Sequence, residues 1–511
     1  MYPTLSFDGA RIEAGALAER AERAAAGFAA MGIREGDVIA AMLRNEPVFL
    51  EVMYAARALG AYLCPINWHF KADEAGYVLR DSGAKIFVVH VDLLAQMRDG
   101  IPQGMPCIAA EPLPATRRAF RLDPQAVPDG WLNWASWRDA NRRHVGPPMR
   151  PRGIVAYTSG TTGRPKGVRR IPPPPESAAR MAEDAARVAR IVFGLDADSR
   201  ALLAAPLYHS APASYLSNVS QAGCTLYLEP RFDAERTLAL IERERITHAY
   251  LVPTMYQRML RLPAEVRARH DVSSMRFVCS TGSPCPPEVK RAMIDWWGPV
   301  INECYASSET GYITFIDATD WLAHPGSAGR AVGEARIRIL DDDGRELPPG
   351  EVGTIHVLQP AYPDFTYIGN DEARRGMERA GLVSVGDMGW LDADGYLYIS
   401  DRKSDMVISG GVNIYPAEIE AVLHEMPGIG DCAVFGIPDE EFGEALAAAV
   451  TVRDGFALAP DDVRRFLSER IAGYKVPRVV TFHDALPRED TGKIFKRRLR
   501  EPYWAGVARR I

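Results

Sequence analysis

Lysine is scarce in this sequence, and its cysteines form no recognisable pattern. Only 8 of the 60 basic residues are lysines, so arginine is the default cation and each lysine calls for a specific reason. The seven cysteines are scattered and lack the paired spacing of zinc ligands, which argues against a disulfide framework or a structural metal site. We therefore expect a protein of a reducing compartment.

Long apolar runs and a basic surplus are also missing. No run approaches the roughly 18 apolar residues of a membrane span, and the start of the chain lacks the basic-then-apolar order of a signal peptide. The 66 acidic residues outnumber the 60 basic ones and give a net charge of −6, which argues against a nucleic-acid binder. We expect a cytoplasmic protein; peripheral contact with a membrane stays open.

The order of the predicted elements indicates α/β structure. At roughly 150 residues per domain, the 511 residues suggest about three domains or subdomains. Strands at 37–43 and 85–90, with a helix at 47–59 between them, predict a largely parallel sheet. The stretch 98–150 is rich in Pro, Gly and Arg and has weak periodicity, so it predicts a surface excursion.

The sequence changes in character after Gly329. Short strands with tight turns predict a small β-rich subdomain across 325–400. The polar stretch 400–405 is a candidate boundary, and the residues after it predict a compact α+β unit. We therefore expect an N-terminal domain over 1–400 and a C-terminal domain over 401–511.

Residues 157–168, Tyr-Thr-Ser-Gly-Thr-Thr-Gly-Arg-Pro-Lys-Gly-Val, suit a phosphate group. Glycine permits positive φ and lets backbone N–H groups converge on an anion. A P-loop would need Gly-Lys-Ser/Thr, but here Pro165 precedes Lys166 and Gly167 follows it. The density of hydroxyls and glycines favours a ligand over a solvated hairpin. The candidate phosphate-binding residues are Thr158, Ser159, Gly160, Thr161, Thr162, Gly163 and Lys166.

Together with further segments in the same order, this loop resembles the adenylate-forming superfamily of acyl-CoA synthetases, luciferases and peptide-synthetase adenylation domains. The chain is most like bacterial fatty-acid or aryl-acid CoA ligases, and the resemblance covers almost all of it. It implies a large N-terminal domain of β-sheets flanked by helices with a small β-rich subdomain, and a mobile small α+β C-terminal domain. The further segments are 206–212, 280–284, 305–309, 385–390, 401–411 and 487–493.

The resemblance implies an ATP-dependent reaction in two halves, with Mg²⁺ and coenzyme A. A carboxylate attacks the α-phosphate of ATP and releases pyrophosphate; a thiol, usually that of CoA, then attacks the acyl carbon and expels AMP. Charge develops on the phosphate oxygens, so cations and donors are the main catalytic resource. Glu309 would hold Mg²⁺, and Ser308, where Thr is usual, would contact the α-phosphate.

The resemblance also assigns residues to the nucleoside. Gly282, Ser283 and Pro284 would pack on adenine, and Tyr305 would stack on its face. Asp387 would accept hydrogen bonds from both ribose hydroxyls, and Arg402 would reach the ribose. The alternatives are a capping aspartate after Gly386 and an exposed arginine at a domain boundary.

Lys493 would be the main catalytic cation, because the family's lysine here bridges the substrate carboxylate and the α-phosphate. The alternative is a basic solvated tail together with 496–500. A lysine directly after Thr491 and Gly492, in a chain dominated by arginine, favours the catalytic role. The resemblance makes Ser404 the domain hinge, where Asp or Lys is usual. Gly410 and Gly411 would let the backbone approach the pantetheine arm.

The implied acyl pocket is roomy and mostly apolar. His209 would gate it or position the carboxylate, although a histidine hydrogen-bonded at a strand end is the alternative. Ala306 replaces the usual Gly, and its methyl group would narrow the acyl or the adenine pocket. No obvious cation stands ready for a second carboxylate, which disfavours dicarboxylic acids. Because many pocket residues are small, we expect a medium or longer fatty acid, or a bulky aryl or alicyclic acid, rather than acetate. The other pocket residues are Ser210, Ala211, Ala213, Ser214, Met255, Thr281 and Ser307.

Two other functions stay open. The thiol acceptor could belong to a separate carrier protein instead of CoA. A non-catalytic binding homologue is the other alternative, and the presence of Lys166, Glu309, Asp387, Arg402 and Lys493 together argues against it. The oligomeric state also stays open, with a homodimer as one option.

Overall fold

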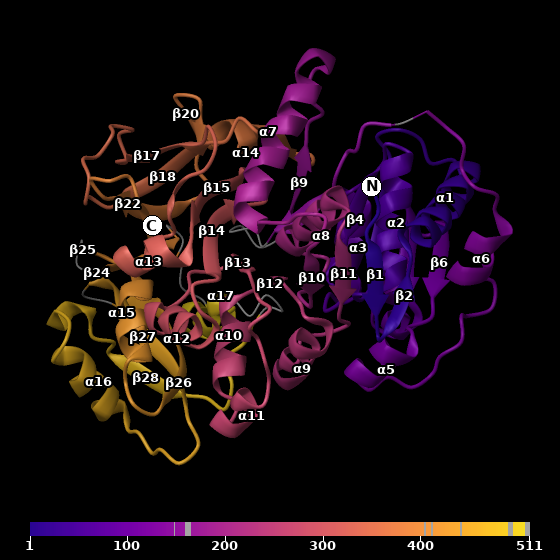
Figure 1. The fold of residues 1–511 in the computed structure, drawn as a ribbon. Helices are drawn as coiled ribbons and strands as arrows, with labels where there is room; N and C mark the ends of the chain where they lie inside the picture. The colour runs from indigo at the N-terminus through magenta and orange to yellow at the C-terminus, as the bar shows by residue number, and fades with distance from the viewer. Residues whose placement is uncertain are drawn as a thin grey trace.

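A computed structural model of the chain describes residues 1–147, 149–158, 165–402, 405–409, 412–439, 442–488 and 494–505, with the backbone alone at 401, 402 and 413. A large N-terminal part contains several β-sheets flanked by helices, and a smaller C-terminal part has its own sheet. In Figure 1 the N-terminal sheet lies at the right, and the C-terminal strands and helices lie at the lower left. The α/β fold class is confirmed.

The first part of the chain forms a parallel sheet with the strand order β4-β3-β5-β6-β7. The predicted strands and helix are confirmed as β3 (Val38–Met42), β5 (Ala84–His90) and α2 (Pro47–Ala58). Every residue of β3 is buried, as expected for a parallel strand covered on both faces. The other elements here include α1 (Ala14–Ala30), β4 (Tyr62–Pro65), α3 (Ala72–Asp81), β6 (Cys107–Ala110) and β7 (Leu132–Asn133).

The prediction that 98–150 is a surface excursion is wrong. This stretch supplies β6 and β7 to the sheet, and it holds α5 (Pro114–Phe120) and α6 (Trp134–Ala140). The two strands have four and two residues, which is too short to show an alternation of apolar and polar residues.

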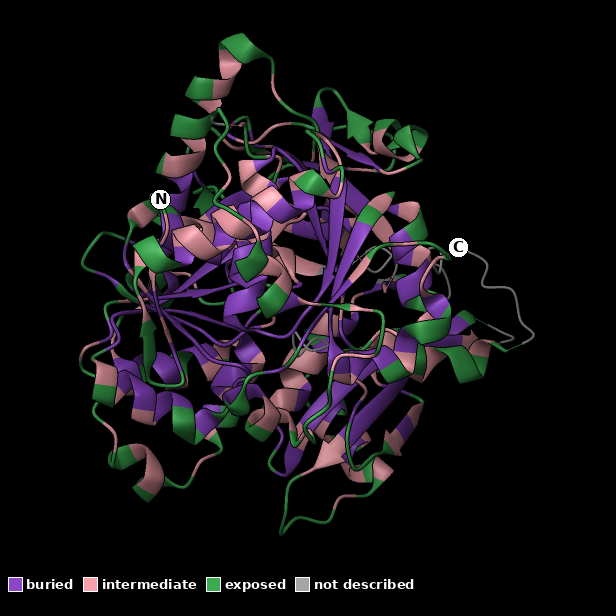
Figure 2. Ribbon diagram, turned by 90° about the vertical axis from the view of Figure 1, so that its right-hand side faces the viewer, coloured by how far each residue is buried: buried purple, intermediate pink, exposed green. Residues whose placement is uncertain are grey.

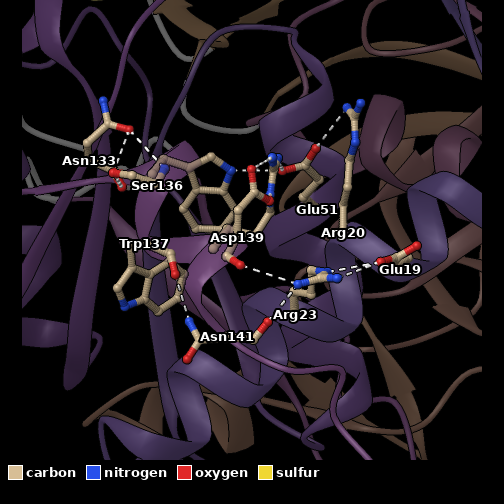
Figure 3. Close-up of polar contacts among 11 residues, drawn as sticks. Glu19, Arg20, Arg23, Glu51, Asn133, Ser136, Trp137, Asp139 and Asn141 are labelled. Carbon is tan, nitrogen blue, oxygen red and sulfur yellow. Dashed lines mark hydrogen bonds and ion pairs between the residues drawn. The ribbon is translucent and has the colours of Figure 1, made fainter.

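Polar contacts fix α6 to α1 and α2. The buried Glu51 carboxylate of α2 accepts hydrogen bonds of 2.8 Å from the Trp134 indole N–H and from the Arg138 guanidinium. Figure 3 shows Arg20 of α1 reaching the same carboxylate, at 3.5 Å, and Arg23 bonded to Glu19 and to the backbone after α6. A buried carboxylate needs such partners to offset its desolvation.

The central sheet has the order β16-β15-β14-β13-β12-β10-β11-β1-β2. Its middle strands β10 to β14 are parallel, and Figure 2 shows that burial is concentrated in the strands. The carboxyl ends of parallel strands meet at one edge, where ligands bind in open α/β sheets. The strands are β1 (Thr4–Phe7), β2 (Ala10–Ile12), β10 (Arg200–Leu203), β11 (Thr225–Leu228), β12 (His248–Leu251), β13 (Phe277–Ser280), β14 (Ile301–Ser307), β15 (Gly311–Ile316) and β16 (Arg330–Ala331).

Helices connect these strands and cover the sheet. In Figure 1, α7 and α8 run side by side, and α8 lies on the side facing the N-terminal sheet. The helices are α7 (Pro175–Phe193), α8 (Ser210–Ala222), α9 (Ala234–Glu244), α10 (Pro253–Leu260), α11 (Ala264–Ala268), α12 (Pro287–Trp297) and α13 (Ala318–Ala323). In the part of the chain that the structure describes, no helix combines the length and the apolar character needed to cross a membrane.

Two smaller sheets complete the N-terminal part. One has the order β20-β21-β18-β22-β23 with β17 beside β18, and the other has the order β19-β9-β8. Their strands are β8 (Ala156–Thr158), β9 (Lys166–Arg170), β17 (Arg336–Leu340), β18 (Gly353–Leu358), β19 (Phe365–Tyr367), β20 (Glu378–Arg379), β21 (Leu382–Val383), β22 (Asp387–Leu391) and β23 (Leu397–Arg402), with α14 (Asp371–Gly376) between β19 and β20.

The C-terminal part is built on the sheet β25-β24-β27-β26, with β28 parallel to β27. It touches the N-terminal part through the Arg261 guanidinium, which donates a hydrogen bond of 2.6 Å to the Gly430 carbonyl. Its elements are β24 (Val407–Ser409), β25 (Val412–Ile414), α15 (Pro416–His424), β26 (Ile429–Asp439), β27 (Gly443–Val452), α16 (Pro460–Ser468), β28 (Val479–Phe482) and α17 (Lys496–Trp504).

Candidate active site

A cavity of about 1760 Å³ lies at the carboxyl edge of the central sheet and is lined by residues from every sheet of the N-terminal part. Residues 488, 495, 497 and 498 of the C-terminal part line it as well. Of the predicted site residues, the cavity is lined by Thr158, Lys166, His209, Ser210, Ala213, Met255, Thr281, Gly282, Ala306, Ser307, Ser308, Glu309 and Asp387, and also by Ala211 and Ser214.

The structure thus brings together segments that are far apart in the sequence. Ser283 and Pro284 follow Gly282 directly but are not among the lining residues. Tyr305 is linked to the cavity through a hydrogen bond to Asp387.

Glu309 and Lys166 face the same aromatic ring. The Tyr367 hydroxyl of β19 donates a hydrogen bond of 3.0 Å to Oε1 of the buried Glu309. The Lys166 ammonium lies 5.3 Å from the centre of the Tyr367 ring. Burial raises the pKa of the Tyr367 phenol, and the Glu309 carboxylate raises it further. A carboxylate at the hydroxyl and an ammonium over the ring therefore both lie beside one neutral tyrosine at the cavity wall.

Arg170 is a site residue that the sequence did not reveal. It ends β9, and its guanidinium donates to the Ser308 carbonyl at 2.9 Å and to the Pro363 carbonyl at 2.8 Å. Burial lowers the pKa of Arg170 to about 10, although the nearby Glu309 carboxylate acts in the opposite direction. In a chain where arginine is the usual cation, nothing in the local sequence distinguishes this arginine from its neighbours.

Ser308 connects two of the predicted segments. Its hydroxyl oxygen lies 2.8 Å from that of Ser210, the first residue of α8. The preceding residue, His209, is the N-cap of this helix, and its ring lies 4.3 Å from that of Tyr208. The loop after β10 and the turn after β14 are thereby held against each other at the cavity.

Asp387 is held at the start of β22. It is only 9% exposed, and its Oδ2 accepts a hydrogen bond of 2.6 Å from the Tyr305 hydroxyl. In the β22–β23 ladder, the backbone of Arg402 lies opposite Asp387. The predicted ribose-binding residues are therefore neighbours on one hairpin, next to the ring predicted to stack on adenine.

The site fits a magnesium ion that is held mainly by a phosphate substrate. In the described ranges, no three His, Cys, Asp or Glu residues form a group that could hold a metal by themselves. Mg²⁺ is usually bound by one or two carboxylates together with substrate phosphates and water. The buried Glu309 carboxylate at the cavity wall matches that requirement.

Several predicted residues lie outside the described residues. They are Ser159, Gly160, Thr161, Thr162, Gly163, Ser404, Gly410, Gly411 and Lys493. For these residues, and for the side chain of Arg402, the roles stay predictions.

Comparisons with known proteins agree with this geometry. Residues 2–362 match the family model described as AMP-binding enzyme, and residues 418–493 match the AMP-binding enzyme C-terminal domain. The chain is 34% identical to an indoleacetate–CoA ligase of Aromatoleum aromaticum, over 95% of this chain and 92% of that protein. It is also 34% identical to a long-chain-fatty-acid–CoA ligase of Mycobacterium tuberculosis, over 95% of this chain and 92% of that protein.

A solved structure shows the same fold. ATP-bound MatB from Rhodopseudomonas palustris superimposes with a TM-score of 0.82 at 28% sequence identity. The match covers 98% of this chain and 96% of that one.

Proposed function

The chain belongs to the AMP-binding enzyme family, and we propose that it activates a fatty acid of medium or greater length, or a bulky aryl or alicyclic acid. The coarser assignment follows from the family. The chain is an AMP-forming acyl-CoA synthetase, which uses ATP, Mg²⁺ and coenzyme A.

The length and width of the cavity support the proposed substrate class. The face of α8 lines the cavity from Ser210, its first residue, to Gln221 near its end. At 1.5 Å per residue, this wall is about 16 Å long. Small or flexible side chains at Ala213 and Met255 leave room beside it. A long or bulky acid would fill this space, whereas acetate would leave most of it empty.

Relatives of this chain support both the aryl acids and the fatty acids of the proposed substrate class. One of them is a ligase of indoleacetate, an aromatic acid, and another is a ligase of long-chain fatty acids. They are equally similar to this chain, so similarity alone favours neither class.

The residues at the cavity would act on ATP as follows. Lys166 would neutralise charge on the β- and γ-phosphates, and Glu309 would hold Mg²⁺, which offsets charge on the phosphate oxygens when bound. The Ser308 hydroxyl would donate to the α-phosphate, and Arg170 would hold the Ser308 backbone in place from behind. Tyr305 and Asp387 would orient the nucleoside.

We also propose that 1–400 and 401–511 are the two domains and that the second rotates about Ser404. Lys493 would then reach the carboxylate and the α-phosphate in one orientation, and Gly410 and Gly411 would approach the pantetheine arm in the other. The contact between Arg261 and Gly430 would break during such a rotation.

The deciding experiment measures pyrophosphate release from ATP and Mg²⁺ with a panel of acids, with and without CoA. We expect release with fatty, aryl or alicyclic acids, sustained only when CoA is present, and AMP formed in step. Equal rates with acetate would contradict the proposed substrate class. Release that does not depend on CoA would instead point to a carrier-protein thiol as the acceptor.

A further inference from the structure

The wall of the cavity along α8 is more polar than the sequence suggested. Ser214, Ser217, Asn218 and Gln221 follow one another at helical spacing, and all of them line the cavity. Ser217 and Asn218 donate hydrogen bonds to the backbone of their own helix, at 3.0 Å and 2.8 Å. Gln221 is exposed and makes no side-chain hydrogen bond to any described residue. The far end of this wall therefore offers an amide to a ligand.

Arg57 lines the same cavity from α2. The Tyr54 hydroxyl lies 2.5 Å from that of Ser220, so this face of α2 packs against the last turns of α8. Arg57 follows Tyr54 by three residues and lies on the same face, one turn further along the helix. Met1 lies near both places: its sulfur is 3.8 Å from the Cβ position of Gly223, the residue that ends α8, and burial and the charge of Arg57 lower the pKa of its amino group.

Arg57 has no compensating anion in the part of the chain that the structure describes. Among the described residues, its guanidinium makes no hydrogen bond and no ion pair, although the residue is half-buried. Its electrostatic neighbours include the Met1 amino group and the phenols of Tyr2 and Tyr54. A partly desolvated cation without a carboxylate partner is a favourable place for a ligand anion.

From these contacts we infer that Arg57 and Gln221 form a second recognition point, which binds a hydrogen-bond acceptor, best a carboxylate, at the far end of the acid. The inference rests on the proposed function, because it assumes that the reacting carboxylate lies near Ser210 and Ser308. An acid that spans the distance of about 16 Å along α8 would be an extended chain of about a dozen carbons, with bonds of about 1.5 Å.

A cation at this place would favour dicarboxylic acids, which the sequence alone disfavours. Arg57 lies about 150 residues before the predicted acyl pocket in the sequence, so local sequence patterns do not connect it with that pocket. The fold places α2 against the end of α8 and thereby supplies this cation.

The test compares three acids of equal length, with a methyl, a hydroxyl or a carboxylate group at the far end. Pyrophosphate release is measured for the full-length enzyme, for Arg57→Leu and for Arg142→Gln, an exposed arginine outside the cavity. In the wild type we expect the lowest KM for the acid with the far carboxylate. In Arg57→Leu the ratio of kcat/KM between the carboxylate and methyl acids should fall about ten-fold, the effect of one charged hydrogen bond. Arg142→Gln should keep the wild-type ratio.

A binding measurement without ATP gives a second readout. The acid with the far carboxylate should raise the melting temperature of the wild type more than the methyl acid does, and Arg57→Leu should lose this difference. An unchanged ratio and an unchanged melting shift in Arg57→Leu would overturn the inference while leaving the proposed function intact. No pyrophosphate release from any of the three acids, or from the wider panel, would overturn the proposed function and the inference with it.

Discussion

The hydroxyl of Tyr305 donates a hydrogen bond of 2.6 Å to Oδ2 of Asp387, across 82 residues of sequence. It joins β14 of the central sheet to β22 of the β-rich sheet. Tyr305 is predicted to stack on adenine and Asp387 to bind the ribose. The bond therefore fixes these two predicted nucleoside-binding side chains relative to each other.

Replacing Tyr305 by phenylalanine removes this bond and keeps the ring. We expect the KM for ATP to rise about three- to ten-fold, the range for one lost hydrogen bond, with a smaller change in kcat. Initial rates of pyrophosphate release against ATP concentration would measure this. Tyr474→Phe, at an exposed position in the C-terminal part, is the matched control. An unchanged KM in Tyr305→Phe would show that the bond does not serve nucleotide binding.

Arg170→Gln should lower kcat about ten-fold or more, because the Ser308 and Pro363 carbonyls each lose a charged donor. Lysine should not rescue the activity, since its single ammonium cannot reproduce the fork of a guanidinium. The KM for the acid should change less than kcat does, and circular dichroism should show an intact fold. Full activity in Arg170→Lys would argue that only the charge at this position matters.

Lys493→Ala should reduce adenylation about a hundred-fold or more while the protein stays folded. Lys496 provides the matched control three residues later, where its ammonium pairs with Glu420 at 2.8 Å. Lys496→Ala should keep most of the activity. Pyrophosphate release without CoA isolates the first half-reaction, and wild-type rates in Lys493→Ala would remove Lys493 from the catalytic set.

His248 makes the stability of the central sheet depend on pH. Burial lowers the pKa of this histidine from its ordinary 6.5, and its ring contacts the Thr247 hydroxyl at 2.8 Å and the Gly194 carbonyl at 3.0 Å. Between the lowered pKa and 6.5, the unfolded chain binds more protons than the folded one, so the free energy of unfolding falls as the pH drops through this window.

The measurement is the melting temperature at about pH 7.5 and about pH 5.5. His248→Asn should show a smaller decrease between these two conditions than the wild type does. His483→Asn, at an exposed position, should decrease as much as the wild type. Equal decreases in all three proteins would mean that His248 does not contribute to the pH dependence.

Local sequence patterns predicted the elements that carry strong local signals. The strand at 37–43 and the helix at 47–59 became β3 and α2, within one residue at each end. The prediction for 98–150 was wrong because its strands, β6 and β7, are too short to show a periodic pattern of apolar residues. Its helix α6 is held by the buried Glu51, which is more than 80 residues away in the sequence.

The sequence by itself determined the family, the chemistry and the short segments that line the site, because each segment needs particular residue types at fixed local spacing. Only the tertiary structure showed that Arg170 binds the Ser308 carbonyl and that Arg57 lines the same cavity as α8. In a chain with 52 arginines, the neighbouring sequence does not distinguish a functional arginine from the others. Its role depends on which carbonyl or cavity the packing of distant helices and strands brings to its guanidinium.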